Sequence, residues 1–391
     1  MKAEQIKELD KEYIIGSYGR YDLVCDHGKN ATMFDKDGKE YIDFTAGIGV
    51  NSLGFADDGW IKAVEEQLHK FQHASNLFYT EPGVELAKKL AERTGMEKVY
   101  FCNSGGEANE TAFKIAKKYG NTMADHRKNT IISLYDSFHG RTVATITATG
   151  QDRFHTECFE PYAQGYDYAA ANDLESMKAA VEKNDPCAII MEIVQGEGGL
   201  IGLEKEFVEG VQKICDEKDI ILIIDEVQAG IGRTGSFFAY QQYGIHPDIV
   251  SFAKGIGAGL PIGGVVCGKK TCDLLVPGEQ GCTFGMNPVV CAGANYVMDT
   301  MDDEFLAAVC KKAEHLRAEL EAIDEVEKTT GLGLMIGVKL KNKKADEVVN
   351  ELLANGLMTL TAVDKIRLLP PLTISQAELD KGIAIFKKVL G

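Results

Sequence analysis

The stretch of residues 220–264, IILIIDEVQAGIGRTGSFFAYQQYGIHPDIVSFAKGIGAGLPIGG, determines the fold of this chain. It opens with five aliphatic residues, 220–224, which are too few for a membrane span and too uniformly apolar for a half-exposed strand. We therefore expect a strand that is buried on both faces, as in a parallel α/β sheet. Residues 225–228, DEVQ, follow at the carboxyl end of this strand, where open α/β sheets bind their ligands.

A second apolar segment, residues 249–253, ends at Lys254 and is followed by a glycine-rich run to Gly264. A lysine at a strand end with glycines around it suits a reactive amine. Together with Asp225 it fits pyridoxal phosphate chemistry, in which Lys254 forms a Schiff base with the aldehyde and Asp225 pairs with the pyridinium nitrogen. That chemistry requires a phosphate site elsewhere in the chain. Without one, an exposed lysine and a capping aspartate would be the simpler interpretation.

Two nucleotide chemistries are alternatives to this one. An aliphatic strand that ends in Asp-Glu is also found in P-loop ATPases, but the nearest approach to their G-x-x-x-x-G-K-[ST] motif, Gly263 to Lys269, has Lys270 where Ser or Thr must stand. Gly230, Gly232 and Gly235 match the dinucleotide fingerprint G-x-G-x-x-G. However, Asp225 and Glu226 would lie beside the pyrophosphate and repel it.

The required phosphate site is predicted after the short strand 98–102. Asn103, Ser104, Gly105 and Gly106 join this strand to a strongly helical segment, 107–119. A polar, glycine-containing turn at a helix N-terminus offers free backbone N–H groups and a favourable dipole for an anion. Ser-Gly before a helix is more often only an N-cap. The turn indicates a phosphate site only in combination with Asp225 and Lys254.

Candidate ligand contacts follow two further expected strands. Residues 130–134 precede Phe138, which could stack on a flat ring or belong to the core, and Arg141, which could bind a carboxylate or lie on the surface. Residues 188–192 precede a loop that places Glu197 past a strand end.

The order of these patterns predicts two domains. Strands and helices alternate over residues 50–280, which indicates one doubly wound, mostly parallel α/β layer. A hairpin pattern at 31–35 and 40–44, with Asp-Gly in its turn, lies outside that layer. Residues 281–391 show long helical spacing over 287–323 and then short strands, so residues 1–49 and 281–391 are expected to form a smaller α+β domain.

Composition limits the partners and the compartment. The chain has 391 residues and a formal net charge of -17, which makes nucleic acid and anionic membrane unlikely partners. The charged N-terminus has no apolar core, so no secretory signal is expected. The ten cysteines lack C-x-x-C pairs and the eight histidines lack ligand spacing, so we expect reduced thiols in the cytoplasm and no metal site.

At this point the chain is identified as similar to the class III, fold-type I aminotransferases, which use pyridoxal 5'-phosphate. The resemblance runs nearly end to end and in order. Its motifs are YIDFTAGIGV, SNLFYTEP, NSGGEANETAFKIAKKY, SFHGRT, QGEGG, IIDEVQAGIGRTG, SFAKGIGAGLPIGG, CTFGMNP and IRLLPPLTI.

The resemblance implies a role for each site residue. Lys254 and Asp225 are the catalytic pair, and the two arginines Arg141 and Arg367 bind substrate carboxylates. Glu197 matches the acid that can pair with Arg367. The implied cofactor contacts are Ser104, Gly105 and Gly106 at the phosphate, Phe138 and Val227 on the two ring faces, Gln228 near the phenolic oxygen, and Glu226 beside Asp225. The resemblance also implies a homodimer with shared active sites, in which Thr283 reaches the phosphate of the neighbouring subunit.

The substrates implied are an ω-amino acid as amino donor and 2-oxoglutarate as acceptor. Ile48 falls where ornithine δ-aminotransferases have a tyrosine, which favours an acylated ornithine. Cys282 replaces a Ser or Thr beside the substrate, and Met286 replaces a Gly, so both affect the expected preference. Ornithine, succinylornithine, succinyl-diaminopimelate and 4-aminobutyrate aminotransferases share the same catalytic residues. An aminomutase of this fold would need no external keto acid, and a non-catalytic binding protein would need no Lys254 with Asp225.

Overall fold

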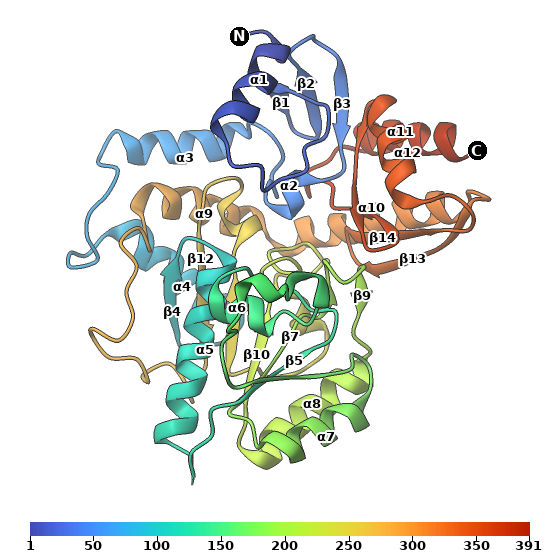
Figure 1. The fold of residues 1–391 in the computed structure, drawn as a ribbon. Helices are drawn as coiled ribbons and strands as arrows, with labels where there is room; N and C mark the ends of the chain where they lie inside the picture. Colours follow the sequence, from blue (N-terminus) through green and yellow to red (C-terminus); the bar gives the residue numbers. More distant parts are fainter. Residues whose placement is uncertain (125) are drawn as a thin grey trace.

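A seven-stranded sheet forms the centre of the computed structural model, which describes residues 1–124 and 126–391 (Figure 1). All neighbouring strands are parallel except for β12, which runs antiparallel to both of its neighbours. The predicted mostly parallel sheet is therefore confirmed. In spatial order its strands are β4 (Lys98–Cys102), β12 (Gly263–Cys267), β11 (Ile249–Phe252), β10 (Ile221–Asp225), β7 (Ala188–Met191), β5 (Ile131–Leu134) and β6 (Tyr166–Ala169).

The aliphatic run that opens the deciding stretch is the middle strand of this sheet. Every residue of β10 is buried, as are those of its neighbours β7 and β11. Helices cover the sheet on both faces, which explains why its strands alternate so little between apolar and polar residues. The covering helices include α5 (Gly105–Thr122), α7 (Leu174–Asn184) and α8 (Lys205–Lys218), and Figure 1 shows α7 and α8 side by side.

Two strands of the sheet were not predicted. The glycines at the start of β12 were interpreted as part of a loop after Lys254. In the structure a Cβ at Gly264 would lie 2.3 Å from the carbonyl oxygen of Tyr100, and one at Gly263 would lie 2.5 Å from that of Ser104. The glycines therefore allow β12 to pair closely with β4, which local sequence cannot reveal. β6 was missed because its four residues carry no uniform apolar pattern.

Two four-stranded sheets lie beside the central one (Figure 1), and a two-stranded sheet is formed by β8 (Val194–Gln195) and β9 (Ile201–Gly202). The N-terminal and C-terminal segments meet in the first of the four-stranded sheets. The predicted hairpin is confirmed as β2 and β3, and a C-terminal strand, β15, pairs with β3 in parallel. In spatial order the first of these sheets contains β1 (Cys25–Lys29), β2 (Thr32–Asp35), β3 (Glu40–Asp43) and β15 (Leu357–Met358). The second contains β13 (Val326–Leu332), β14 (Met335–Leu340), β17 (Lys365–Leu368) and β16 (Leu360–Ala362).

The long helical pattern over 287–323 is two helices, α9 (Pro288–Thr300) and α10 (Asp303–Glu321). Asp302 ends the pattern between them because its side chain caps α10 by accepting from the Phe305 N–H at 2.8 Å. The other helices are α1 (Ala3–Tyr13), α2 (Ala46–Gly49), α3 (Asp58–Leu68), α4 (Glu81–Thr94), α6 (Val143–Ala148), α11 (Ala345–Ala354) and α12 (Gln376–Leu390).

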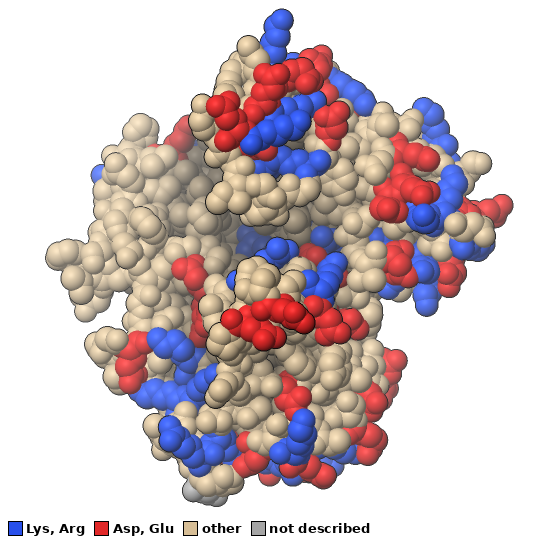
Figure 2. All heavy atoms as spheres, in the orientation of Figure 1, with Lys and Arg blue, Asp and Glu red and all other residues tan. Residues whose placement is uncertain are grey.

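A cleft crosses the molecule between the central sheet and the small sheets, and Figure 2 shows basic side chains within it. The carboxyl ends of β5, β7 and β10 carry the residues that line its floor. None of the helices in the described ranges is long and apolar enough to cross a membrane.

Candidate active site

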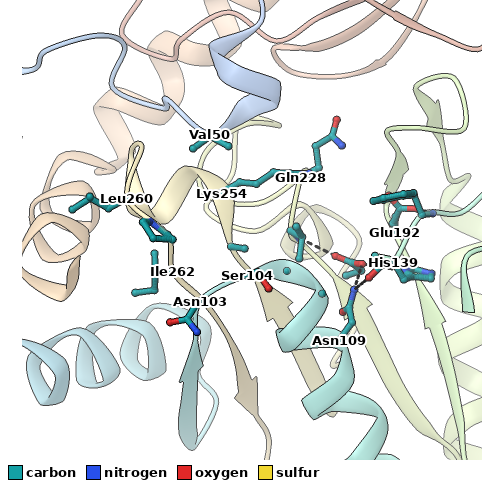
Figure 3. Close-up of a pocket in the computed structure, with 18 of the residues that line it drawn as sticks. Val50, Asn103, Ser104, Asn109, His139, Glu192, Gln228, Lys254, Leu260 and Ile262 are labelled. Carbon is teal, nitrogen blue, oxygen red and sulfur yellow. Dashed lines mark hydrogen bonds and ion pairs between the residues drawn. The ribbon is translucent and has the colours of Figure 1, made fainter. Parts of the chain in front are cut away.

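A cavity of about 340 Å³ lies at the carboxyl ends of the central strands (Figure 3). It brings together residues that are far apart in the sequence, from Val50 to Ile262. Among the residues proposed from sequence, those that line it are Ser104, Gly105, Gly106, Phe138, Asp225, Val227, Gln228 and Lys254. The carboxyl-end rule for open α/β sheets therefore located the cavity correctly.

Asp225 ends β10 at the floor of the cavity and is held by three donors. Its Oδ2 accepts from Asn109 Nδ2 at 2.7 Å and lies 2.8 Å from His139 Nδ1, and the dashed lines in Figure 3 mark these contacts. Its Oδ1 accepts from the Val227 N–H at 3.0 Å. These contacts fix the orientation of the buried Asp225 carboxylate.

Asn109 and His139 were not singled out from the sequence. Asn109 lies in the second turn of α5, and His139 lies in the turn after β5, within the quoted SFHGRT motif. A buried asparagine on an amphipathic helix gives no pattern of its own, because only the fold shows that a carboxylate lies opposite it. The signal that could have found them is the presence of polar residues at positions that face the sheet.

Lys254 follows β11 and faces the same cavity. Its backbone is left-handed, with φ at +51°, which is a strained conformation for a residue with a side chain. Burial lowers the pKa of Lys254, although the neighbouring charge of Asp225 opposes this. A depressed pKa increases the fraction of neutral amine, which is the form that acts as a nucleophile or accepts a proton.

The predicted phosphate cradle is the N-terminus of α5. Ser104 caps the helix, since its Oγ accepts from the Glu107 N–H at 3.2 Å and its carbonyl accepts from the Ala108 N–H at 3.0 Å. The amides of Gly105 and Gly106 precede these bonds, so they remain free for an anion at the positive end of the helix. A Cβ at Gly105 would lie 2.6 Å from a methyl carbon of Val227, so glycine is required there.

Arg367 and Glu197 form an ion pair near Lys254, although neither residue lines the cavity. Arg367 lies on β17 of a small sheet, and its Nη1 donates to Glu197 Oε1 at 2.5 Å. Burial acts to raise the pKa of Glu197, but the Arg367 guanidinium outweighs it and holds that pKa below its usual value. Two residues that are 170 positions apart are thus joined across the cleft.

The other proposed substrate and cofactor contacts, Arg141, Cys282 and Thr283, are not among the residues that line the cavity. The Arg141 guanidinium lies 5.9 Å from the ring centroid of Phe138 and 4.9 Å from that of Phe154, and the residue is exposed. Cys282 accepts from Asn103 Nδ2 at 3.1 Å through its Sγ, which places it behind the phosphate cradle. Thr283 is exposed and does not line the cavity of this single chain.

Glu226 is the predicted cofactor contact next to Asp225. It is not among the residues that line the cavity, although Asp225 and Val227 on either side of it are. Its Oε1 instead accepts from the Tyr240 N–H at 2.8 Å, and burial raises its pKa to about 8.

A buried acid that the sequence did not single out, Glu192, lines the cavity in place of Glu226. It accepts from the Phe138 N–H at 2.9 Å. Burial and the charge of Asp225 raise its pKa well above its usual value. A group of three or more side chains able to hold a metal does not occur in the described residues.

The fold and the site together define a class of protein. A large, mostly parallel sheet with smaller sheets at its carboxyl edge, a buried lysine and a carboxylate with a helix N-terminus beside them are the framework of fold-type I pyridoxal-phosphate enzymes. The family model of class-III aminotransferases matches residues 16–390. The chain belongs to the class-III aminotransferases.

Named relatives agree with this family along the full chain. An acetylornithine aminotransferase from Haemophilus ducreyi is 48% identical over 391 residues, which cover 100% of this chain and 99% of the relative. The crystal structure of an ornithine aminotransferase from Toxoplasma gondii superposes with a TM-score of 0.95 at 27% identity, covering 100% and 95% of the two chains. N-acetylornithine aminotransferase from Stenotrophomonas maltophilia superposes with a TM-score of 0.85 at 31% identity, covering 98% and 97%.

The residues present fit pyridoxal phosphate, the cofactor of this family. Three buried polar atoms in the described part of the cavity lining, Asn109 Oδ1, His139 Nε2 and Gln228 Oε1, have no partner. Gln228 would face the phenolic oxygen and Asp225 the ring nitrogen, while the amides of Gly105 and Gly106 would hold the phosphate. The bound cofactor supplies an aldehyde for amines and a ring that accepts electrons.

Proposed function

We propose that the chain transfers the δ-amino group of N-acetylornithine to 2-oxoglutarate, giving N-acetylglutamate semialdehyde and glutamate, a step of arginine biosynthesis. The observation that carries this proposal is the 48% identity with an acetylornithine aminotransferase over the whole chain. The cavity supports the chemistry, because it is lined by the Lys254 amine and the Asp225 carboxylate. Arg141 contacts Phe138 of its lining, and Arg367 forms an ion pair with Glu197.

Each residue has a separate task in this reaction. Lys254 Nζ would hold the cofactor aldehyde, and as a free amine it would take the proton from the reacting carbon and return it. Asp225 stabilises positive charge at the ring nitrogen, and Asn109 and His139 hold Asp225 in place. Burial of these groups strengthens every charge interaction among them.

Substrate preference is the first test of the proposal. Ile48 is 41% exposed and lies two residues before Val50, which lines the cavity, so it presents an apolar surface near the mouth. It offers no polar contact to a free α-amine. We expect kcat/KM for N-acetylornithine to exceed that for ornithine or 4-aminobutyrate by about tenfold or more in assays with 2-oxoglutarate. Equal or better turnover of either competing amine would reject the assignment.

The two substrates require different behaviour from Arg367. N-acetylornithine reacts at its distal amine, and its carboxylate can bind to Arg141. Glutamate reacts at its α-amine, which brings its α-carboxylate to Arg367 and its second carboxylate to Arg141. We infer that Glu197 covers Arg367 in the first half-reaction and leaves it in the second.

Glu197→Ala tests this gate. Removal of the carboxylate should speed the glutamate half-reaction relative to the acetylornithine half-reaction, by up to about a hundredfold if the pair biases binding by a few kcal/mol. Stopped-flow measurement of both half-reactions gives the ratio directly. Glu197→Gln keeps the size of the side chain without its charge and should act in the same direction. An unchanged ratio in both variants would show that Glu197 is not the gate.

We also propose the domain division and the assembly. Residues 50–280 would form the large domain, and residues 1–49 with 281–391 the small one, although α9 packs against α3 and α4 of the former. A homodimer is supported by a group of exposed apolar side chains close to Thr283, namely Leu77, Tyr79 and Phe284. The segment with Leu77 and Tyr79 is held there because Asn76 Nδ2 donates to the Gly285 carbonyl. A monomeric mass in sedimentation would exclude it. Free thiols throughout support a cytoplasmic location.

A further inference from the structure

We propose that Arg153 is the second partner of Glu197, which receives this carboxylate when Arg367 has to bind the α-carboxylate of glutamate or 2-oxoglutarate. Arg153 would thus be a positioning residue that acts on substrate only through Glu197. The inference rests on the proposed function, and it adds the residue with which Glu197 pairs after it leaves Arg367.

The two oxygens of Glu197 face two different guanidinium groups. Oε1 accepts from Arg367 Nη1 at 2.5 Å, and Oε2 lies 3.9 Å from Arg153 Nη2. The Arg367 side chain is 5% exposed and that of Arg153 is 52% exposed. Glu197 is therefore paired with the buried Arg367, and a rotation of its side chain would bring it to the more exposed Arg153.

A destination is needed because Glu197 is itself enclosed. Its side chain is only 24% exposed, so a carboxylate that left Arg367 without a new partner would lose an ion pair and regain little hydration. Arg153 removes this penalty. In the paired state shown here the 3.9 Å contact with a half-exposed guanidinium contributes little, so Arg153 favours the released state more than the paired one.

Contacts with Gln151 and Phe154 hold the Arg153 side chain in place. Its Nε donates to Gln151 Oε1 at 3.0 Å, and the buried Gln151 is fixed by donating to the Ser137 carbonyl at 3.0 Å. The guanidinium lies 4.7 Å from the ring centroid of Phe154. These contacts use Nε and the flat face of the group, which leaves its Nη atoms for a carboxylate.

No other acidic group in the described ranges lies within 4.0 Å of Arg153. The Phe154 ring also contacts Arg141. Arg153 therefore lies beside the arginine that is proposed to bind the distal carboxylate. This neighbourhood allows a rival role, in which Arg153 binds the dicarboxylate directly. The test has to separate the two roles.

Binding of two unreactive ligands to the holoenzyme measures the gate without turnover. Glutarate carries both carboxylates of 2-oxoglutarate, whereas N-acetylnorvaline carries only the one that N-acetylornithine has. We expect Arg153→Gln to weaken glutarate binding in calorimetry by about tenfold, the loss of one charge-assisted hydrogen bond, with N-acetylnorvaline changed by less than about twofold. The KM for 2-oxoglutarate should rise in parallel while kcat changes little.

Arg127→Gln is the matched control, because Arg127 is also exposed but donates to Asn121 far from the cleft. It should leave the binding of both ligands unchanged. Arg153→Lys, which keeps the charge and loses the planar fork, should fall between wild type and Arg153→Gln.

The Glu197→Ala background identifies the route of the effect. If Arg153 acts through Glu197, Arg153→Gln should not alter glutarate binding once Glu197 is absent. An equal loss in that background would overturn the inference, because Arg153 would then bind the dicarboxylate itself. Unchanged glutarate binding in Arg153→Gln alone would overturn it too. If Glu197→Ala by itself fails to tighten glutarate binding, the gate is absent, and the inference fails together with it.

Discussion

Lys254→Ala is expected to lower turnover of N-acetylornithine by about 10⁴-fold or more, since one side chain supplies both the amine and the proton transfer. No other amine can replace it, because no other lysine lines the cavity in the described part of the chain. Borohydride should fix the cofactor to the peptide containing Lys254 in the wild type and to no peptide in the variant. The free amides at the phosphate cradle should still allow the variant to retain some cofactor without a covalent bond.

Lys269→Ala is the control for this experiment, because Lys269 lies exposed after β12 and outside the cavity. It should keep full activity and the same labelled peptide. Fixation of the cofactor at any other lysine in the wild type would show that Lys254 has been assigned wrongly.

The second large effect is expected for Asp225→Asn. An amide cannot hold positive charge at the ring nitrogen, so stabilisation is lost where charge develops in the transition state. We expect single-turnover rates to fall by about 10² to 10³-fold while substrate dissociation constants change by only a few-fold. The amide also disturbs the bonds from Asn109 and His139, so a thermal-unfolding measurement should accompany the kinetics.

Glu226→Gln provides a neighbouring control for Asp225→Asn. Burial raises the pKa of Glu226 to about 8, so the native side chain is mostly protonated at neutral pH and resembles an amide. It lies outside the cavity and accepts from the Tyr240 N–H. Single-turnover rates should therefore match those of the wild type. Wild-type rates for Asp225→Asn itself would contradict the role of Asp225.

The parts of the site that follow buried strands could be predicted from sequence. Asp225 and Lys254 each end an uninterrupted apolar run, and the parallel sheet brings such ends to one edge. The glycines and Ser104 before α5 gave a local pattern of the same kind. These predictions needed only the period of apolar residues and the chemistry of the residues that interrupt it.

The remaining parts depend on contacts between distant segments. Arg367 meets Glu197 through the pairing of β17 with β14, a register that no local pattern fixes. Glu192 is the last residue of a predicted strand, and only the fold shows that its carboxyl lies against the Phe138 amide. The direction of the Glu226 side chain could not be inferred from Asp225, because β10 ends at Asp225.

The most direct test of the whole account follows the nitrogen atom. Purified enzyme should be given N-acetylornithine labelled with ¹⁵N at its δ-amine, together with unlabelled 2-oxoglutarate, and the products should be examined by mass spectrometry. We predict one labelled glutamate for each N-acetylglutamate semialdehyde formed. When 2-oxoglutarate is omitted, we predict no reaction beyond a single turnover. Label that remains on an isomerised amino acid, or is released as ammonia without glutamate, would contradict the account.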